Sequence, residues 1–120
     1  MLNMTISSYE DLEVFKRAHT LVINIYKLIL LFPKERQYLL SSQLFRSCSS
    51  IPANIAECFG RFTTKEKQRF LYISRGSAEE KKYHLLLAKD LKFITDNQYI
   101  NLSKETTEII KMLNGLIKKI

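Results

Sequence analysis

The sequence predicts an all-α protein, an antiparallel up-and-down four-helix bundle that occupies residues 1–120 as a single domain. Apolar residues make up 46% of the chain, which is too many for a disordered protein, and 3 glycines with 2 prolines are too few for a β-sandwich. Four long segments repeat apolar residues at alternating steps of three and four, the spacing of one helix face. A length of 120 residues fits one hydrophobic core and leaves no room for a second domain.

The first predicted helix begins near Ser8, whose hydroxyl can cap a turn rich in carboxylates, and it stops before Pro33. Its bundle-facing seam is Phe15, Ala18, Val22, Ile25, Ile29 and Phe32. The apolar residues outside that seam are Leu21, Ile23, Leu28, Leu30 and Leu31. Three partner helices cannot cover a helix that is apolar on nearly all sides, so we expect another copy of the chain to cover the surplus.

The second predicted helix runs from about Glu35 to Gly60, where the glycine is a natural stop signal. Its apolar seam is Leu44, Cys48, Ile51, Ile55 and Phe59. Pro52 falls inside this helix, and proline removes one backbone donor and crowds the carbonyl four residues earlier. Because the seam keeps its phase across Pro52, we expect a kinked helix there and not a loop.

The third predicted helix opens at Thr63, which has capping-box spacing to Glu66, and extends to about Thr95. Such a helix would be close to ~50 Å long. The seam we assign to it is Phe70, Ile73, Ser77, Glu80, His84, Leu87, Leu91 and Ile94, which is polar in the middle. Gly76 lies mid-helix at a cost of ~1 kcal/mol relative to alanine, which suggests that another backbone approaches closely there.

A turn is expected at Asp96-Asn97-Gln98-Tyr99, followed by a last helix from roughly Ser103 to Lys119. The seam of this last helix is Leu102, Thr106, Ile109, Leu113, Leu116 and Ile120. No internal repeat, linker or low-complexity stretch interrupts the four segments, which is consistent with one bundle.

Positive charge is concentrated in the second half of the chain. Residues 1–60 carry six basic and five acidic side chains and residues 61–120 carry thirteen and seven, so the second half holds most of the formal net charge of +7. An excess of this kind attracts polyanions and is multiplied when several copies assemble around one axis. The candidate phosphate-binding residues are Lys65, Lys67, Arg69, Lys81, Lys82, Lys89, Lys92, Lys111, Lys118 and Lys119. No RNP motif, zinc finger or KH-type GxxG accompanies them, so binding should follow charge and shape.

A second stripe on the second helix consists of hydrogen-bonding side chains: Gln43, Arg46, Ser50, Asn54, Glu57 and Arg61. If the third helix lies alongside, it adds Arg75, Glu79, Glu80 and His84. Two readings stay open. These residues form either a ligand or nucleic-acid site, or a polar network that fixes helix register and subunit contacts, and the second reading is favoured.

Nothing in the sequence predicts catalysis, a cofactor or a small-molecule substrate. The chain has no HExxH, no GxSxG and no glycine-rich phosphate loop. Glu80 and His84 lie one turn apart, but a di-metal bundle needs further glutamate and histidine motifs, and His19 has no nearby carboxylate partner. Cys48 and Cys58 read as reduced, buried apolar groups. We therefore expect a non-enzymatic protein without a metal site.

The expected location is the cytoplasm. The longest apolar run, residues 21–32, is interrupted by polar residues and is shorter than the roughly 20 residues that cross a bilayer. The first residues show no basic stretch followed by an apolar core and a cleavage site, so no secretory signal is expected. A membrane-surface helix is disfavoured because the bundle already uses the apolar stripes.

Several short motifs follow one another along most of the chain. These are Tyr9-Glu10-Asp11-Leu12, Phe32-Pro33-Lys34-Glu35, Ser42-Gln43-Leu44, Ser50-Ile51-Pro52-Ala53-Asn54-Ile55-Ala56-Glu57 with Gly60-Arg61, Phe70-Leu71-Tyr72-Ile73, Arg75-Gly76-Ser77, Met112-Leu113 and Leu116-Ile117. In this order they resemble the bacterial four-helix-bundle family of the 23S rRNA intervening-sequence protein. The resemblance implies a homopentamer, similar to the basic, nucleic-acid-binding accessory protein of diversity-generating retroelements, and it names no catalytic residues.

This chain departs from the family pattern at four positions. Phe45 and Gln37 replace arginines, Leu39 replaces a glycine, and Cys58 stands where glycine is usual. We therefore expect a homo-oligomer that binds RNA, DNA or a nucleoprotein partner with little sequence preference. The rival hypothesis is a scaffold or toxin–antitoxin-like interaction protein with no nucleic-acid role.

Overall fold

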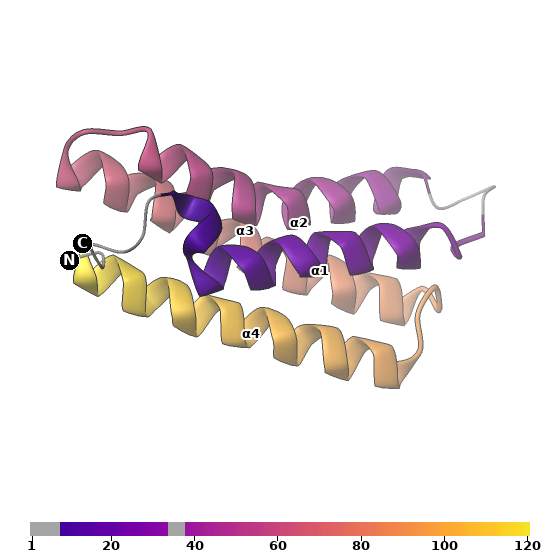
Figure 1. Ribbon diagram of the computed structural model, residues 1–120. Coiled ribbons are helices and arrows are strands. Elements are labelled where there is room, and N and C mark those ends of the chain that lie inside the picture. The colour runs from indigo at the N-terminus through magenta and orange to yellow at the C-terminus, as the bar shows by residue number, and fades with distance from the viewer. Residues whose placement is uncertain (1–7, 34–37) are drawn as a thin grey trace.

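The computed structural model describes residues 8–33 and 38–120, and every regular element within these ranges is helical. A 3-10 turn, η1 (Tyr9–Asp11), precedes α1 (Glu13–Ile29), α2 (Tyr38–Phe59), α3 (Thr64–Asp90) and α4 (Asp96–Lys119). Figure 1 shows that consecutive helices run antiparallel, in a bundle that measures 47 × 22 × 20 Å. The predicted all-α, antiparallel four-helix bundle is confirmed.

The core is built mainly from the seams of α2 and α4. Leu44, Cys48, Ile51 and Ile55 of α2 are completely buried, as is Leu113 of α4. Truncating one such large side chain to alanine typically costs 2–5 kcal/mol, roughly, because part of the resulting cavity remains open. Among helices that lie side by side, α2 and α3 pack most extensively and α1 and α4 least, and the diagonal pairs α1–α3 and α2–α4 do not pack on each other. The seams predicted for α2 and α4 lie in the core, to which α1 and α3 also contribute.

The chain enters α1 in two steps. Ser8 does act as a cap, but of the short turn η1, where its side chain accepts from the backbone of Glu10 at 3.2 Å and its own N–H donates to Asp11 at 3.2 Å. Leu12 is then extended, and α1 begins at Glu13. The helix also ends at Ile29, before the predicted limit at Pro33. The buried residues of α1 are Val14, Ala18, Leu21 and Ile25, so Leu21 belongs to the core.

Helix α2 continues through Pro52, as the unbroken phase of its seam predicted. The ring of Pro52 is buried, and the predicted kink at this residue stays a prediction. The helix ends at Phe59, and the Gly60 N–H donates to the carbonyl of Glu57 at 3.0 Å. The predicted start at Glu35 lies outside the described residues, as does Gln37.

The seam predicted for α3 is wrong by about one residue along most of its length, although His84 and Ile94, which belong to it, are buried. The buried positions are Leu71, Ser74, Ala78, Lys81, His84, Leu85 and Ala88. The large apolar residues Phe70 and Leu87 are only half-buried, and Ile73 is exposed. Large side chains lie on both sides of α3: Leu71 and Leu85 are completely buried, whereas Phe70 and Leu87, one and two residues away, are only half-buried. Large apolar residues on two faces do not define a single phase, and the predicted seam followed the outer face.

The boundary between α3 and α4 also differs from the prediction. Helix α3 ends at Asp90, five residues early, and Lys92 takes a left-handed conformation with φ 65°. Its N–H donates to Lys89 O and the Phe93 N–H to Ala88 O, both at 2.9 Å, which closes the helix in the way glycine usually does. Thr95 then forms a capping box with Gln98 and starts α4 at Asp96. The predicted turn at residues 96–99 is therefore the first turn of α4.

Gly76 does not mark a close approach within this chain. A methyl group placed on its Cα would meet nothing within 4 Å, and the residue is exposed on the outer side of α3. The expectation of a neighbouring backbone is therefore not met by any described part of the same chain.

Candidate nucleic-acid interface

Nine of the ten predicted phosphate-binding residues are exposed or half-buried, on α3, α4 and the loop between them. Lys81 is the exception, because its side chain is 0% exposed and points into the bundle core. Its assignment to the surface was therefore wrong. The residues that remain available are Lys65, Lys67, Arg69, Lys82, Lys89, Lys92, Lys111, Lys118 and Lys119.

These cations differ in how their charge is compensated. Arg69 pairs with Glu66 at 3.7 Å, Lys89 with Asp90 at 3.6 Å and Lys111 with Glu108 at 3.9 Å. All three pairs are long and lie at the surface, so each contributes at most about 1 kcal/mol. Lys89 is the least accessible of these cations, because its side chain is 28% exposed and its ammonium lies 4.9 Å from the centroid of the Tyr99 ring. Five of these cations form no ion pair with a described carboxylate: Lys65, Lys67, Lys82, Lys92 and Lys118.

Lys81 instead forms part of a buried polar layer. Its Nζ donates to the hydroxyl of Thr106 at 2.7 Å, and that hydroxyl donates to the carbonyl of Leu102 at 2.8 Å. Burial lowers the pKa of Lys81 to about 8, against smaller opposing effects of Cys48 and Glu105. Burial likewise raises the pKa of the Cys48 thiol to about 11. The thiol is therefore neutral at physiological pH, as expected for a structural cysteine.

The polar stripe of α2 meets α3 near its middle. The Arg46 guanidinium donates to Gln43 at 2.9 Å and forms an ion pair with Glu80 of α3. Glu80 lies 3.9 Å from Nε2 of His84, whose Nδ1 is 2.9 Å from the hydroxyl of Ser47. Burial lowers the pKa of His84, Arg46 lowers it further, and Glu80 opposes both. This cluster fixes the α2–α3 register with charges that are largely neutralised.

Other members of the stripe form separate groups. Ser77 of α3 donates to the hydroxyl of Ser50 at 2.9 Å, and Asn54 donates to the backbone carbonyl of Ser50 at 2.8 Å. Glu57 pairs with Arg61 at 2.7 Å, one turn apart. The stripe is therefore a series of short-range contacts and not one continuous network.

Arg75 and Glu79 do not join the α2 stripe. Arg75 donates to the side chain of Asn114 on α4 at 2.7 Å, and Glu79 is exposed with no hydrogen bond to a described residue. Sequence reasoning also missed two buried serines. Ser74 donates to the carbonyl of Ile51 at 2.8 Å, and Ser47 holds His84. Their only signal is a small polar residue at a core position of a helix.

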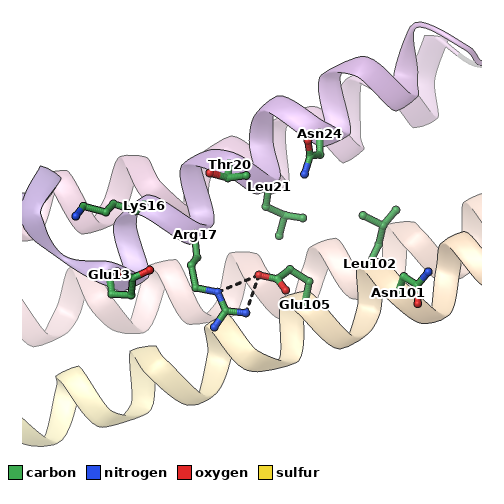
Figure 2. A pocket seen from close by; sticks show the side chains of 9 residues that line it. All are labelled: Glu13, Lys16, Arg17, Thr20, Leu21, Asn24, Asn101, Leu102 and Glu105. Atoms are coloured by element: carbon green, nitrogen blue, oxygen red, sulfur yellow. Dashed lines mark hydrogen bonds and ion pairs between the residues drawn. The ribbon is translucent and has the colours of Figure 1, made fainter.

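A groove of about 450 Å³ separates α1 from α4, where the two helices pack loosely. Figure 2 shows Leu21 and Leu102 pointing into this space and Arg17 reaching across it to Glu105. The Arg17 guanidinium donates to one oxygen of Glu105 at 2.8 and 3.1 Å. The charges of Arg17 and Glu105 neutralise each other. We therefore interpret their contact as one that joins α1 to α4 and not as a binding site.

The described part of the chain offers neither a metal site nor a membrane-spanning helix. No group of three or more histidine, cysteine, aspartate or glutamate side chains is placed to hold a metal ion. Among residues 8–33 and 38–120, no helix is both long and apolar enough to cross a membrane.

Known proteins share this fold. The chain is similar to a crystal structure of a protein with unknown function from the S23 ribosomal protein family of Bacteroides thetaiotaomicron, with a TM-score of 0.81 and 30% sequence identity. That match covers 88% of this chain and 98% of the other. A search of curated proteins found no match. A model of the 23S rRNA-intervening sequence protein family matches residues 10–115, a range that includes most of the bundle. The chain therefore belongs to the family of 23S rRNA-intervening sequence proteins.

Proposed function

We propose that this protein is a non-enzymatic homo-oligomer that binds RNA or DNA mainly through charge, in the cytoplasm. The observation that carries the proposal is the set of cations on α3, α4 and the loop between them that have no carboxylate partner among the described residues, led by Lys65, Lys82 and Lys92. Phosphate groups are the natural complement of such a surface, since they give affinity without base readout. The family description refers to 23S rRNA, which supports an RNA-related role.

Self-association is supported by an apolar edge on α1 and α2. We define this edge as Ile23, Tyr26, Leu30, Tyr38, Leu39 and Phe45, all large apolar side chains that are exposed. Tyr26 and Phe45 connect the two helices through an edge-to-face ring contact at 6.1 Å. An exposed group of this size is typical of protein interfaces, and a second copy of the chain is the partner that we propose.

The resemblance to the family implies five copies, and a closed ring repeats the same surface on every copy. Each copy contributes a formal net charge of +7, so assembly concentrates cations that a single bundle holds only sparsely. The apolar edge lies on α1 and α2, whereas the unpaired cations lie on α3, α4 and their loop. Assembly through the apolar edge therefore leaves the cations free to bind phosphate.

A salt titration tests nucleic-acid binding directly. We expect the logarithm of the affinity for a labelled oligonucleotide to fall linearly with the logarithm of salt, by roughly 0.7 to 0.9 per phosphate contact. Lys82→Ala should weaken binding and reduce this slope, whereas Lys27→Ala, an exposed lysine on α1, should change neither. The absence of any complex with RNA or DNA at low salt would refute the proposal and favour the scaffold hypothesis.

Sedimentation tests the assembly. Leu30 is 60% exposed within the apolar edge, and Leu30→Ser should shift the protein toward smaller species without unfolding it. Ile100→Ser is the matched control, because Ile100 is similarly exposed, at 58%, on α4 and outside the edge. A wild-type protein that sediments as a single bundle at micromolar concentration would contradict the proposed assembly.

A further inference from the structure

An open hollow lies on the outer side of α3, and its lining includes apolar residues that have no role in binding phosphate. Its volume is about 520 Å³, within the range of small-ligand sites. Two of its residues, Tyr72 and Ile73, are exposed apolar groups that play no part in the bundle core. The full lining is Lys65, Glu66, Gln68, Arg69, Tyr72 and Ile73.

The ring of Tyr72 packs against the guanidinium of Arg75. It is 48% exposed, and the guanidinium of Arg75 lies 4.8 Å from its centroid. Arg75 is in turn fixed by its 2.7 Å hydrogen bond to Asn114 on α4, and it is not among the residues that line the hollow. Tyr72 is therefore a preordered aromatic ring that borders the hollow and requires little further ordering when a planar group stacks on it.

The charges around the ring favour an anionic partner. Lys65 has no ion pair to a described carboxylate, and the partner of Arg75 is a neutral amide. Glu66 offsets Arg69 only through a pair at 3.7 Å between side chains that are 63% and 43% exposed. Lys65 and Arg69 precede Tyr72 by about two turns and one turn of the same helix, so the cations and the ring share one side of α3.

We propose that this hollow binds an unpaired nucleotide of a single-stranded RNA or DNA, with its base stacked on Tyr72 and against Ile73 and its phosphates on Lys65 and Arg69. This inference rests on the proposed nucleic-acid binding and adds a preference for unpaired bases. Every base has a face that an aromatic side chain can stack on, so the site needs no base sequence. A paired base in a duplex keeps its faces covered by its neighbours and gains nothing from Tyr72.

A second exposed aromatic residue lies at the same end of α3. Phe62, in the loop between α2 and α3, is 98% exposed and so contributes almost nothing to the core. The loop stands at the end of the bundle from which α3 starts, as Figure 1 shows. A strand that leaves the hollow toward the start of α3 therefore meets another ring on which a base can stack.

The test measures binding of the full-length protein to a labelled oligonucleotide of mixed sequence, single-stranded and as the duplex, at one salt concentration. Tyr72→Ala should weaken single-strand binding roughly five- to a hundredfold, the effect of losing one stacked base, and leave duplex binding nearly unchanged. Tyr72→Phe should restore single-strand binding, because the ring and not the hydroxyl stacks. Tyr83→Ala is the matched control, since Tyr83 is 59% exposed on the same helix but outside the hollow.

The outcomes separate this inference from the function it rests on. If the wild type binds both forms and Tyr72→Ala weakens both equally or neither, the stacking site is refuted while charge-led binding stands. If neither form binds, the proposed function itself fails. If Tyr72→Ala changes the sedimentation of the protein, the hollow is a contact between copies, which also overturns the inference. Circular dichroism confirms that each variant is folded before binding is measured.

Discussion

Replacing Lys81 with methionine should stabilise the protein at neutral pH. Its side chain is completely buried, and burial lowers its pKa from 10.5 to about 8. Each pKa unit corresponds to ~1.4 kcal/mol, so the folded state disfavours the charged lysine by about 3 kcal/mol relative to the unfolded chain. Methionine has nearly the same volume and removes this cost. It also loses the hydrogen bond from the Lys81 ammonium to Thr106, and a hydrogen bond to a charged group is worth roughly 1.5–3 kcal/mol. We therefore expect Lys81→Met to raise the free energy of unfolding by about 1 kcal/mol at pH 7.

The sign of the pH dependence gives a second, independent signal. Stability rises with pH wherever the unfolded state binds more protons than the folded state. Between pH 8 and 10.5 the folded protein has released the Lys81 proton while the unfolded chain still holds it. The wild type should therefore gain stability relative to Lys81→Met across this window, and the advantage of the variant should shrink as the pH approaches 10.5.

Urea denaturation followed by circular dichroism measures both effects, at one protein concentration because assembly shifts apparent stability. Lys82→Met is the matched control: Lys82 is the next residue and only half-buried, so its variant should differ little from the wild type at either pH. If Lys81→Met were less stable than the wild type at pH 7, the buried ammonium would be a net stabilising group, and the reasoning from desolvation would be wrong.

Three further changes test other parts of the structure. The lowered pKa of His84 means that the unfolded chain takes up a proton first as the pH falls below 6.5, so stability should decrease there, and His84→Gln should remove that decrease in urea titrations. Gly76→Ala should raise stability by ~1 kcal/mol, as should the control Gly115→Ala, since neither added methyl group meets an atom within 4 Å; a loss of assembly in Gly76→Ala alone would instead place another copy there. Thr95→Ala should cost ~1 kcal/mol in thermal unfolding by removing the cap of α4, and no change would contradict the observed start of that helix.

Periodicity predicted the helices whose core positions hold large apolar side chains. In α2 the residues Leu44, Ile51 and Ile55 recur at helical spacing and are all buried. In α3 the same method found the wrong face, because the core positions mix Leu71 and Leu85 with Ser74 and Lys81. Apolar residues such as Phe70 and Leu87 flank those positions, so apolar spacing alone does not distinguish the buried face from its neighbour.

Cap residues in the sequence predicted one helix start correctly but not all of them, and a helix end set by the backbone was missed. Thr63 was recognised as the cap of α3, and its side chain accepts from Glu66 at 3.1 Å. The end of α3 depends on the left-handed conformation of Lys92, a position where glycine is the usual signal and lysine gives none. The capping box from Thr95 to Gln98 was present in the sequence, but it was taken for a turn.

The candidate site shows the same division between local and long-range information. The exposed cations follow from composition, because a lysine on a helix surface needs no partner to stay in water. The burial of Lys81 does not, since it depends on where Thr106 of α4 lies relative to α3, 25 residues earlier in the chain. The Arg46–Glu80 pair likewise depends on the register between α2 and α3. Contacts between helices are set by packing, which one sequence does not specify residue by residue.

Assembly and nucleic-acid binding should be coupled. The apolar edge lies on α1 and α2 and the unpaired cations lie on α3, α4 and their loop, so copies can join through the first surface while the second stays open to phosphate. In the proposed assembly, burying Tyr26 and Leu30 between copies would remove apolar surface from water, and each added copy would contribute its own cations to the same particle. One phosphate strand then meets more cations than a single bundle offers. A neutral change that only dissociates the copies, Leu30→Ser, should therefore weaken binding to a long oligonucleotide and flatten its salt dependence, although Leu30 carries no charge. A dissociated variant that binds a long oligonucleotide as tightly as the assembly would show that each bundle acts alone.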